Sequence, residues 1–320
     1  MDRGEARIAL VGATGTVGSQ IAELIGERNL PYSDLKLFAR DSAAQVVEVG
    51  ERSVPVVSFN GARDLSAFDI AFLAIPATAA REIIEAQPGP VLIDLSAATL
   101  APQDMVAMAA PGLTARERIV QLARARVFAV PHPAAQLIAT ILQALRSDNF
   151  AGGLIMLSAS AAGHQGVSGL FQQSADLLNA RLDLDDEPQL AFNVFPAQEA
   201  QELARVLAAQ IDVLGADSSR LVLDLVRVPA FHGSGIALFR PAGATSTEWM
   251  ERLRSAPGLI LVTNGDAAGF VDAVGQEGAI TRISSAGAGA AIWCTFDAAR
   301  LAALTALWIA ESLSENRGLG

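Results

Sequence analysis

The sequence is poor in several residue types on which common protein chemistries depend. Its 320 residues include one cysteine, Cys294, and one lysine, Lys36. A single thiol excludes an internal disulfide and a cysteine-rich metal site, and Lys36 is the one candidate for a Schiff base. Cys294 lies in the apolar run Ala-Ile-Trp-Cys-Thr-Phe, which is typical of a buried, unreactive thiol. Aromatic residues make up only 5% of the chain, so we expect an aliphatic core.

Positive charge and long apolar runs are also scarce. The chain has 34 acidic and 23 basic residues, which gives a net charge of −11. Nucleic-acid binding needs clustered positive charge, so we expect no nucleic-acid partner. No apolar run approaches the ~20 residues of a membrane-spanning helix, and the first five residues contain no apolar stretch of the signal-peptide type. We therefore expect a cytoplasmic protein that does not associate with membranes.

The clearest motif that is present occupies residues 6–18. An apolar run ends at Val11, and Gly12, Gly15 and Gly18 follow before a helix-like segment. A strand, a glycine turn and a helix in this order predict a dinucleotide site, in which the glycines permit a tight turn, backbone approach to a pyrophosphate, and close helix packing. An ordinary strand–helix turn with small residues is the alternative. The predicted cofactor-binding residues are Gly12, Thr14, Gly15, Thr16, Val17, Gly18 and Arg40.

Arg40 indicates which dinucleotide this site takes. It follows an expected strand at residues 35–39, where such folds contact the adenosine ribose. An arginine suits the 2′-phosphate of NADP, so we expect NADP rather than NAD, although the neighbouring Asp41 opposes a phosphate electrostatically. A solvated arginine at a strand end is the alternative.

The spacing of apolar segments predicts two domains. Up to the turn Pro131-His132-Pro133, strands alternate with helices such as residues 77–86, and this alternation predicts a doubly wound parallel sheet. Longer strands follow, at residues 220–228 among others, with helices at residues 134–145, 167–182 and 198–213. The expected fold is α/β: an N-terminal Rossmann domain with a doubly wound sheet (residues 1–132 and 298–320) and an α+β dimerisation domain (residues 133–297).

Several segments together resemble one known family, the aspartate-semialdehyde dehydrogenases. The resemblance covers nearly the whole chain, and its order and spacing are more specific than any one motif. It implies a semialdehyde dehydrogenase-like fold and NADP as the cofactor. It also implies three functional side chains: a cysteine thiolate as the nucleophile, a histidine as the general base, and an arginine that binds the substrate carboxylate. The segments are Gly12-Ala-Thr-Gly-Thr-Val-Gly18, Val91-Leu-Ile-Asp-Leu-Ser-Ala97, Ala191-Phe-Asn-Val-Phe-Pro196 and Arg227-Val-Pro-Ala-Phe-His-Gly233.

The functional positions of that family are largely replaced. Ala134 stands where the resemblance places the cysteine, Ser234 where it places the histidine, and Leu157 where it places a glutamine, while Arg227 remains as the substrate-like arginine. The phosphate-binding arginine expected within residues 95–100 is also missing. Since hydride transfer from an aldehyde here requires a nucleophile, no intact catalytic set is predicted. The resemblance narrows to the USG-1-like branch, which lacks the catalytic cysteine.

Two functions remain open. The first is a non-catalytic homologue that binds NAD(P) and dimerises. The second is an NADP-dependent semialdehyde oxidoreductase of amino-acid biosynthesis with weak or altered chemistry. We expect a homodimer in either case, and a shared dimerisation surface also permits a hetero-dimer with an active paralogue.

The chain has three histidines, His132, His164 and His232, and each is expected in a loop near the former catalytic cleft. One hypothesis is that they converge as a repurposed site, either for a metal or for acid–base work. The alternative is that each is an ordinary loop histidine with a backbone or water partner. Because metal sites normally add a carboxylate, we assign no metal ligands.

Overall fold

The chain folds into two compact units, one of residues 1–132 and 299–320 and one of residues 133–298. The computed structural model describes residues 5–40, 45–97, 106–122, 125–146, 152–181, 188–240, 246–262, 269–286 and 289–317. Among these residues, no helix is both long enough and apolar enough to cross a membrane.

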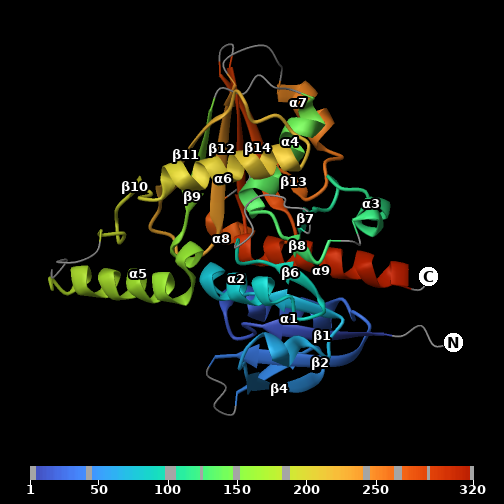
Figure 1. Ribbon diagram of the computed structural model, residues 1–320. Coiled ribbons are helices and arrows are strands. Elements are labelled where there is room, and N and C mark those ends of the chain that lie inside the picture. Colours follow the sequence, from blue (N-terminus) through green and yellow to red (C-terminus); the bar gives the residue numbers. More distant parts are fainter. Residues whose placement is uncertain are drawn as a thin grey trace. The chain divides into compact units, whose positions relative to one another are not determined.

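The first unit is built on a sheet with the strand order β3-β4-β2-β1-β5-β6-β8-β7 (Figure 1). All neighbouring pairs are parallel except the β3–β4 hairpin. Because β1 lies between β2 and β5, the strand order reverses at β1, where doubly wound folds bind ligands. The strands are β1 (Ala6–Val11), β2 (Tyr32–Ala39), β3 (Val46–Val49), β4 (Arg52–Ser58), β5 (Ile70–Leu73), β6 (Val91–Asp94), β7 (Val106–Met108) and β8 (Val127–Ala129).

Helices from both ends of the chain complete this unit. The C-terminal helix α9 (Ala298–Arg317) returns to it and buries an aliphatic stripe that includes Ala303, Ala306 and Leu307. Arg300 joins α9 to α1 by hydrogen bonds to Gln20, Glu23 and Glu27. The other helical segments are α1 (Thr16–Glu27), the 3-10 turn η1 (Ala62–Leu65), α2 (Ala77–Ala86) and α3 (Arg116–Gln121).

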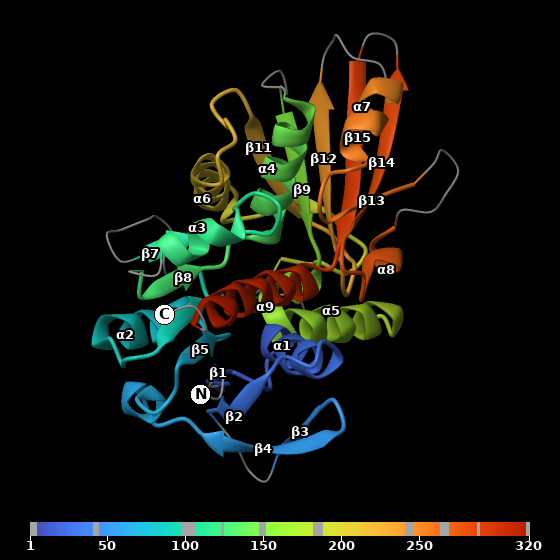
Figure 2. The same ribbon diagram turned by 90° about the vertical axis from the view of Figure 1, so that its right-hand side faces the viewer.

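The second unit contains a mixed sheet with the strand order β10-β11-β9-β12-β15-β14-β13. Its strands are β9 (Gly152–Leu157), β10 (Phe195–Pro196), β11 (Val222–Arg227), β12 (Ser234–Arg240), β13 (Leu259–Leu261), β14 (Ala279–Ala286) and β15 (Gly289–Phe296). Figure 2 shows α4 and α7 in front of these strands, and α6 contacts both α4 and β11. The helical segments are α4 (Pro133–Leu145), the 3-10 turn η2 (Ala159–Ala162), α5 (Gly163–Leu178), α6 (Ala200–Val213), α7 (Ser246–Leu253) and α8 (Phe270–Ala273).

The fold class predicted from the sequence is confirmed, and the helix predicted at residues 77–86 has those bounds. The helix predicted at residues 167–182 is wrong by four residues at each end. It begins at Gly163, whose φ of +70° follows the η2 turn, and it ends at Leu178 because Ala180 adopts a left-handed conformation with φ +53°. β14 and β15 were not predicted as strands.

Candidate functional site

The glycine loop leaves β1 in a tight turn. Gly12 has φ +88°, which favours glycine. The backbone N–H groups of Gly12 and Ala13 both donate to the carbonyl of Phe38 on β2, at 2.8 and 3.0 Å. The turn is therefore anchored to the neighbouring strand, and it lies at the carboxyl end of β1.

The three glycines of the loop differ in what surrounds them. A Cβ at Gly12 would lie 2.2 Å from the carbonyl oxygen of Ala74, and a Cβ at Gly18 would lie 2.0 Å from that of Gly12. Both positions therefore exclude a side chain because backbone atoms fill the space. A Cβ at Gly15 would meet the Gly12 oxygen at 3.3 Å and no other atom closer than 4.0 Å. Gly15 thus leaves an open cradle at the start of α1.

The N-terminus of α1 faces this cradle. Gly15 is its N-cap and supplies no side-chain hydrogen bond to the first turn, so backbone N–H groups at Thr16 and Val17 point out of the helix end. A helix N-terminus carries a partial positive charge that attracts phosphate. Thr14 is exposed next to it. The predicted cofactor residues of the loop are thus grouped at one helix end.

Arg40 follows β2 directly and is exposed. Since β2 neighbours β1, Arg40 lies at the same edge of the sheet as the glycine loop. Asp41, which was expected to oppose a phosphate, lies outside the described residues.

In the second unit, three of the positions singled out by resemblance lie side by side. Arg227 ends β11, Leu157 ends β9 and Ser234 begins β12, and the strand register pairs Leu157 with both of the others. Ser234 and Leu157 are buried. Ala134 is the second residue of α4 and has no exposed surface. Leu157, Ser234 and Ala134 carry neither a thiol nor an imidazole.

Arg227 has a carboxylate partner within its own chain. Its Nη2 donates to Oε1 of Glu199, just before α6, and the arginine side chain is 22% exposed. Burial acts to raise the pKa of Glu199, but hydrogen bonds from its own backbone and from Arg227, together with the arginine's charge, lower that pKa overall. No local pattern indicates this pair, because its members are 28 residues apart in sequence.

The histidines do not form a metal site in the described part of the chain, where no group of three or more His, Cys, Asp and Glu side chains is arranged to hold an ion. The expectation of a loop is wrong for His164, which is the second residue of α5, whereas His232 lies in the loop before β12, and both are exposed. The segments that precede them are joined, because the Ser160 N–H in η2 donates to the Phe231 carbonyl at 3.0 Å. His132 belongs to the first unit, and burial lowers its pKa to about 4.

The one cysteine of the chain, Cys294, is not placed to act as a nucleophile. It lies within β15 with no exposed surface, and its Sγ is 3.4 Å from Oγ1 of Thr281. Burial raises the pKa of the thiol to about 12, although the bond to Thr281 acts in the opposite direction. The expectation of a buried, unreactive cysteine agrees with this geometry.

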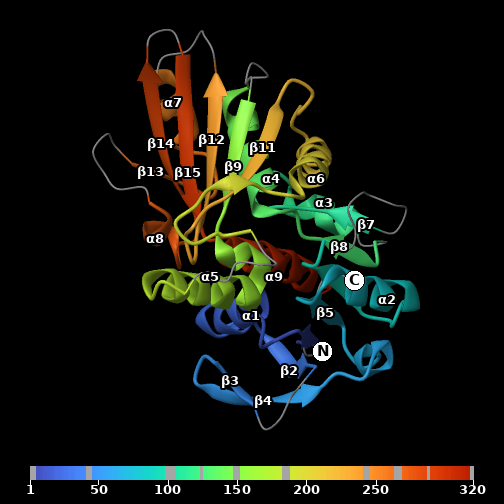
Figure 3. The same cartoon turned by 90° about the vertical axis from the view of Figure 1, so that its left-hand side faces the viewer.

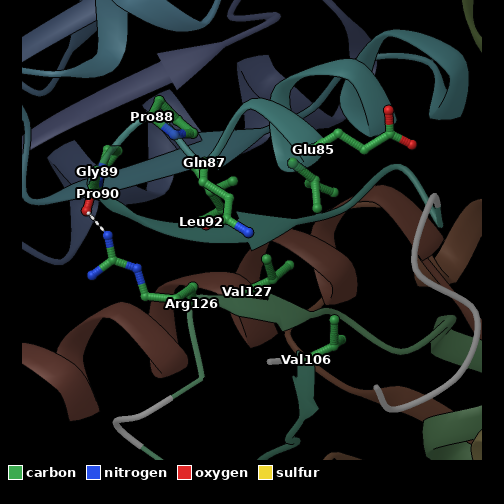
Figure 4. A pocket seen from close by; sticks show the side chains of 10 residues that line it. Glu85, Gln87, Pro88, Gly89, Pro90, Leu92, Val106, Arg126 and Val127 are labelled. Carbon is green, nitrogen blue, oxygen red and sulfur yellow. Dashed lines mark hydrogen bonds between the residues drawn. The ribbon is translucent and has the colours of Figure 1, made fainter. Parts of the chain in front are cut away.

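A separate hollow of about 350 Å³ lies in the first unit at the amino ends of β6 and β8 (Figure 4). There the Arg126 Nη2 donates a hydrogen bond to the Gly89 carbonyl oxygen at 2.8 Å. Dinucleotides bind at the carboxyl ends of such strands, so this hollow is not the cofactor site. Its lining includes Glu85, Gln87, Pro88, Pro90, Leu92 and Val127.

Comparisons with known proteins agree with this geometry. The model for the NAD-binding domain of semialdehyde dehydrogenases matches residues 7–122. A USG-1 protein homologue of Pseudomonas aeruginosa is 30% identical, over 96% of this chain and 97% of its own. An aspartate-semialdehyde dehydrogenase of Synechocystis is 27% identical, over 97% of each chain.

Solved structures of aspartate-semialdehyde dehydrogenases are also similar to this chain. The structure of a probable aspartate-semialdehyde dehydrogenase from P. aeruginosa has a TM-score of 0.82 and 27% identity, and covers 97% of this chain and 98% of that one. Aspartate semialdehyde dehydrogenase II from Vibrio cholerae, at 23% identity and a TM-score of 0.84 over 98% of this chain and 99% of that one, shares the fold. The chain therefore belongs to the aspartate-semialdehyde dehydrogenase family, together with the USG-1 homologues, and carries that family's NAD(P)-binding domain.

Proposed function

We propose that this protein binds NADP at its glycine loop, forms a homodimer, and does not catalyse the standard semialdehyde dehydrogenase reaction. The observation that carries the proposal is the contrast between the two units. The loop at Gly12, Gly15 and Gly18 has an open cradle, whereas Ala134 and Ser234 stand where the resemblance places the nucleophile and the base. On this proposal the chain is a member of the family that retains its fold and its nucleotide binding without its standard activity.

The choice of NADP over NAD rests on Arg40. An exposed guanidinium at the carboxyl end of β2 suits a 2′-phosphate, whereas an acidic side chain there would bind a 2′-hydroxyl. We expect Arg40→Ala to weaken NADP binding about tenfold or more and to leave NAD binding nearly unchanged.

The absence of standard turnover rests on three features of the second unit. Ala134 has no nucleophilic atom, and the loss of a nucleophile alone lowers rates by several orders of magnitude. Cys294 is buried, with a pKa of about 12, so it does not supply a thiolate. Glu199 already neutralises Arg227, so a substrate carboxylate would have to compete with it.

A binding titration followed by an assay tests the proposal. NADP and NAD are each titrated into the full-length protein by calorimetry, and NADPH formation is then followed with aspartate semialdehyde and phosphate. We expect saturable NADP binding without turnover. NADP-dependent turnover with phosphate would refute the non-catalytic function, and the absence of any nucleotide binding would refute the cofactor assignment.

The second candidate is an oxidoreductase with altered chemistry. It is favoured by the hydrogen bond from Ser160 to Phe231, which joins the segment before His164 to the loop that carries His232, close to the start of β12 at Ser234. This candidate predicts a weak activity with other aldehydes that is lost in the double variant His164→Gln/His232→Gln. If the activity of that variant equals that of the native chain, the histidines take no part.

A further inference from the structure

The hollow in the first unit forms where α2 ends. Because β5 and β6 are parallel, α2 runs back between them, and its last turn comes to lie at the amino ends of the strands. Figure 3 shows α2 beside β7 and β8. At the end of α2, Gln87 has a left-handed conformation with φ +46° and leads into the connection Pro88-Gly89-Pro90. The two prolines restrict the backbone beside the hollow, so this wall is rigid.

The floor of the hollow is a row of apolar side chains across three parallel strands. The register pairs Leu92 on β6 with Val127 on β8, and Val127 with Val106 on β7. Paired residues of neighbouring strands point to the same face of a sheet, and all three of these residues line the hollow. Ile84, in the last turn of α2, packs against the same apolar cluster. The floor therefore suits the apolar part of a ligand.

One guanidinium lies at the rim of this floor. Arg126 directly precedes β8, and its carbonyl accepts a hydrogen bond from the Leu92 N–H at 2.9 Å. Its Nη2 donates to the Gly89 carbonyl at 2.8 Å, so backbone and side chain both hold Arg126 beside the hollow (Figure 4). A guanidinium has further N–H donors, and in the part of the chain that the structure describes Arg126 forms no ion pair. Since the side chain is exposed, its charge is available to an external anion.

The other polar groups of the lining determine which anion fits. Figure 4 shows the Gln87 amide extended over the hollow and the Glu85 carboxylate directed away from Arg126. A guanidinium and a neutral amide together match one carboxylate with a single charge, which a guanidinium binds in a bidentate manner. The ammonium of an α-amino acid would lie next to the guanidinium, and the acidic side chain of the lining points elsewhere. The lining thus favours an acid that has no amino group.

We propose that this hollow binds a small monocarboxylic acid with a branched or aromatic apolar body and no amino group. The carboxylate lies between Arg126 and the Gln87 amide, and the body covers the row of Leu92, Val127 and Val106. The volume of about 350 Å³ is near the lower end of the range of small-molecule sites, about 300 to 1,000 Å³. The glycine loop lies at the opposite edge of the same sheet, so this inference does not depend on NADP binding.

The compound 4-methylpentanoate is a probe with this chemistry. It is titrated into the full-length protein, and binding is followed by saturation-transfer difference NMR. Leucine, which adds an amino group, and 4-methylpentanamide, which has a neutral amide in place of the carboxylate, are the ligand controls. We expect saturable binding of the acid with a Kd below about 10 mM, and a Kd about tenfold higher or more for each control. No saturation in this range, or equal affinity for the amide, would overturn the proposal.

Three variants test the position of the site. Arg126→Gln removes the positive charge, and Gln87→Glu brings a carboxylate over the hollow at an exposed position. We expect each to raise the Kd of 4-methylpentanoate about tenfold or more. Arg81→Gln is the matched control, because Arg81 is an exposed arginine of α2 outside the lining, and we expect its Kd to stay within about twofold of the native value.

Thermal melts check that each variant is folded. If Arg126→Gln lowers the melting temperature and leaves the Kd unchanged, Arg126 only holds the turn at Gly89 and the proposal is wrong.

A second titration at saturating NADP separates this site from the nucleotide site. We expect the Kd of 4-methylpentanoate to stay within about twofold, because the two sites lie at opposite edges of the sheet. Displacement of the acid by NADP would place it at the glycine loop and overturn the proposal. A protein that binds NADP but not the acid would refute this inference alone. A protein that binds the acid but not NADP would support this inference and refute the cofactor assignment.

Discussion

Gly15 and Gly18 belong to the same loop but are required for different reasons. At Gly18 a Cβ would lie 2.0 Å from a backbone oxygen, whereas at Gly15 the nearest atom would be 3.3 Å away. We expect Gly18→Ala to lower the free energy of unfolding by about 3 kcal/mol or more, and Gly15→Ala by about 1 kcal/mol or less. We expect Gly15→Ala to weaken NADP binding at least tenfold, because its methyl group enters the pyrophosphate cradle.

Urea unfolding and NADP titration of the two variants check this prediction. Equal losses of stability in both would show that Gly15 is a packing residue like Gly18, and unchanged NADP affinity in Gly15→Ala would place the nucleotide elsewhere.

The thiol of Cys294 is a second prediction at the scale of one residue. Burial raises its pKa to about 12, so almost none of it is thiolate at pH 8, and it is also closed to reagents. We expect the native protein to release no thiol signal with Ellman's reagent within an hour, and one equivalent after denaturation. A thiol signal from the native protein within that hour would contradict this account.

At the scale of elements, the C-terminal helix α9 is held to α1 and α3 by two arginines in different surroundings. The Arg300 side chain is 9% exposed and binds Glu23 and Glu27, the latter at 2.7 Å. The Arg116 side chain is 41% exposed and binds Glu315, also at 2.7 Å. We expect Arg300→Ala to destabilise the fold by about 2 kcal/mol, because it removes a nearly buried group that bonds several partners.

Arg116→Ala is the matched control, with an expected loss of less than about 1 kcal/mol, as for exposed ion pairs. Thermal and urea melts measure both variants. If the two losses are equal, the burial of Arg300 does not determine its contribution.

At the scale of the whole molecule, His132 makes stability depend on pH. Its pKa falls from 6.5 to about 4 on folding because burial disfavours the charged form. The unfolded chain therefore binds this proton more readily, and the stabilising effect is complete above pH 6.5 and lost as the pH falls towards 4. A shift of this size corresponds to up to about 3 kcal/mol in the free energy of unfolding.

Urea unfolding between pH 4 and pH 8 measures this dependence in the native chain and in His132→Gln. We expect the variant to lose less stability between pH 6.5 and pH 4 than the native chain does. His164→Gln is the control, since His164 is exposed. Parallel pH profiles for the native chain and His132→Gln would show that another group is responsible.

The elements that sequence reasoning located best are those specified by local pattern. The turn at Gly12 has a positive φ that favours glycine, and glycine is recognisable in the sequence. The helix α2 at residues 77–86 has an amphipathic period within one short segment. The bounds of α5 were misplaced, because the η2 turn ahead of it and the left-handed Ala180 after it have no strong local signal. β14 went unrecognised because its sequence does not alternate apolar and polar residues, so that its pairing with β15 shows it as a strand. β15 has the apolar run from Ile292 to Phe296, which was interpreted only as a sign of a buried cysteine.

The sequence by itself determined the family and the glycine loop with its strand and helix. It also predicts that Ala134 and Ser234 replace a catalytic cysteine and histidine. These are properties of residue identity and of short-range spacing. The tertiary structure decided the ion pair between Arg227 and Glu199 and the burial of Cys294. It also decided the register that places Leu157 between Arg227 and Ser234. Strand register joins segments that are far apart in the chain, and a shift of one residue would turn each side chain to the opposite face.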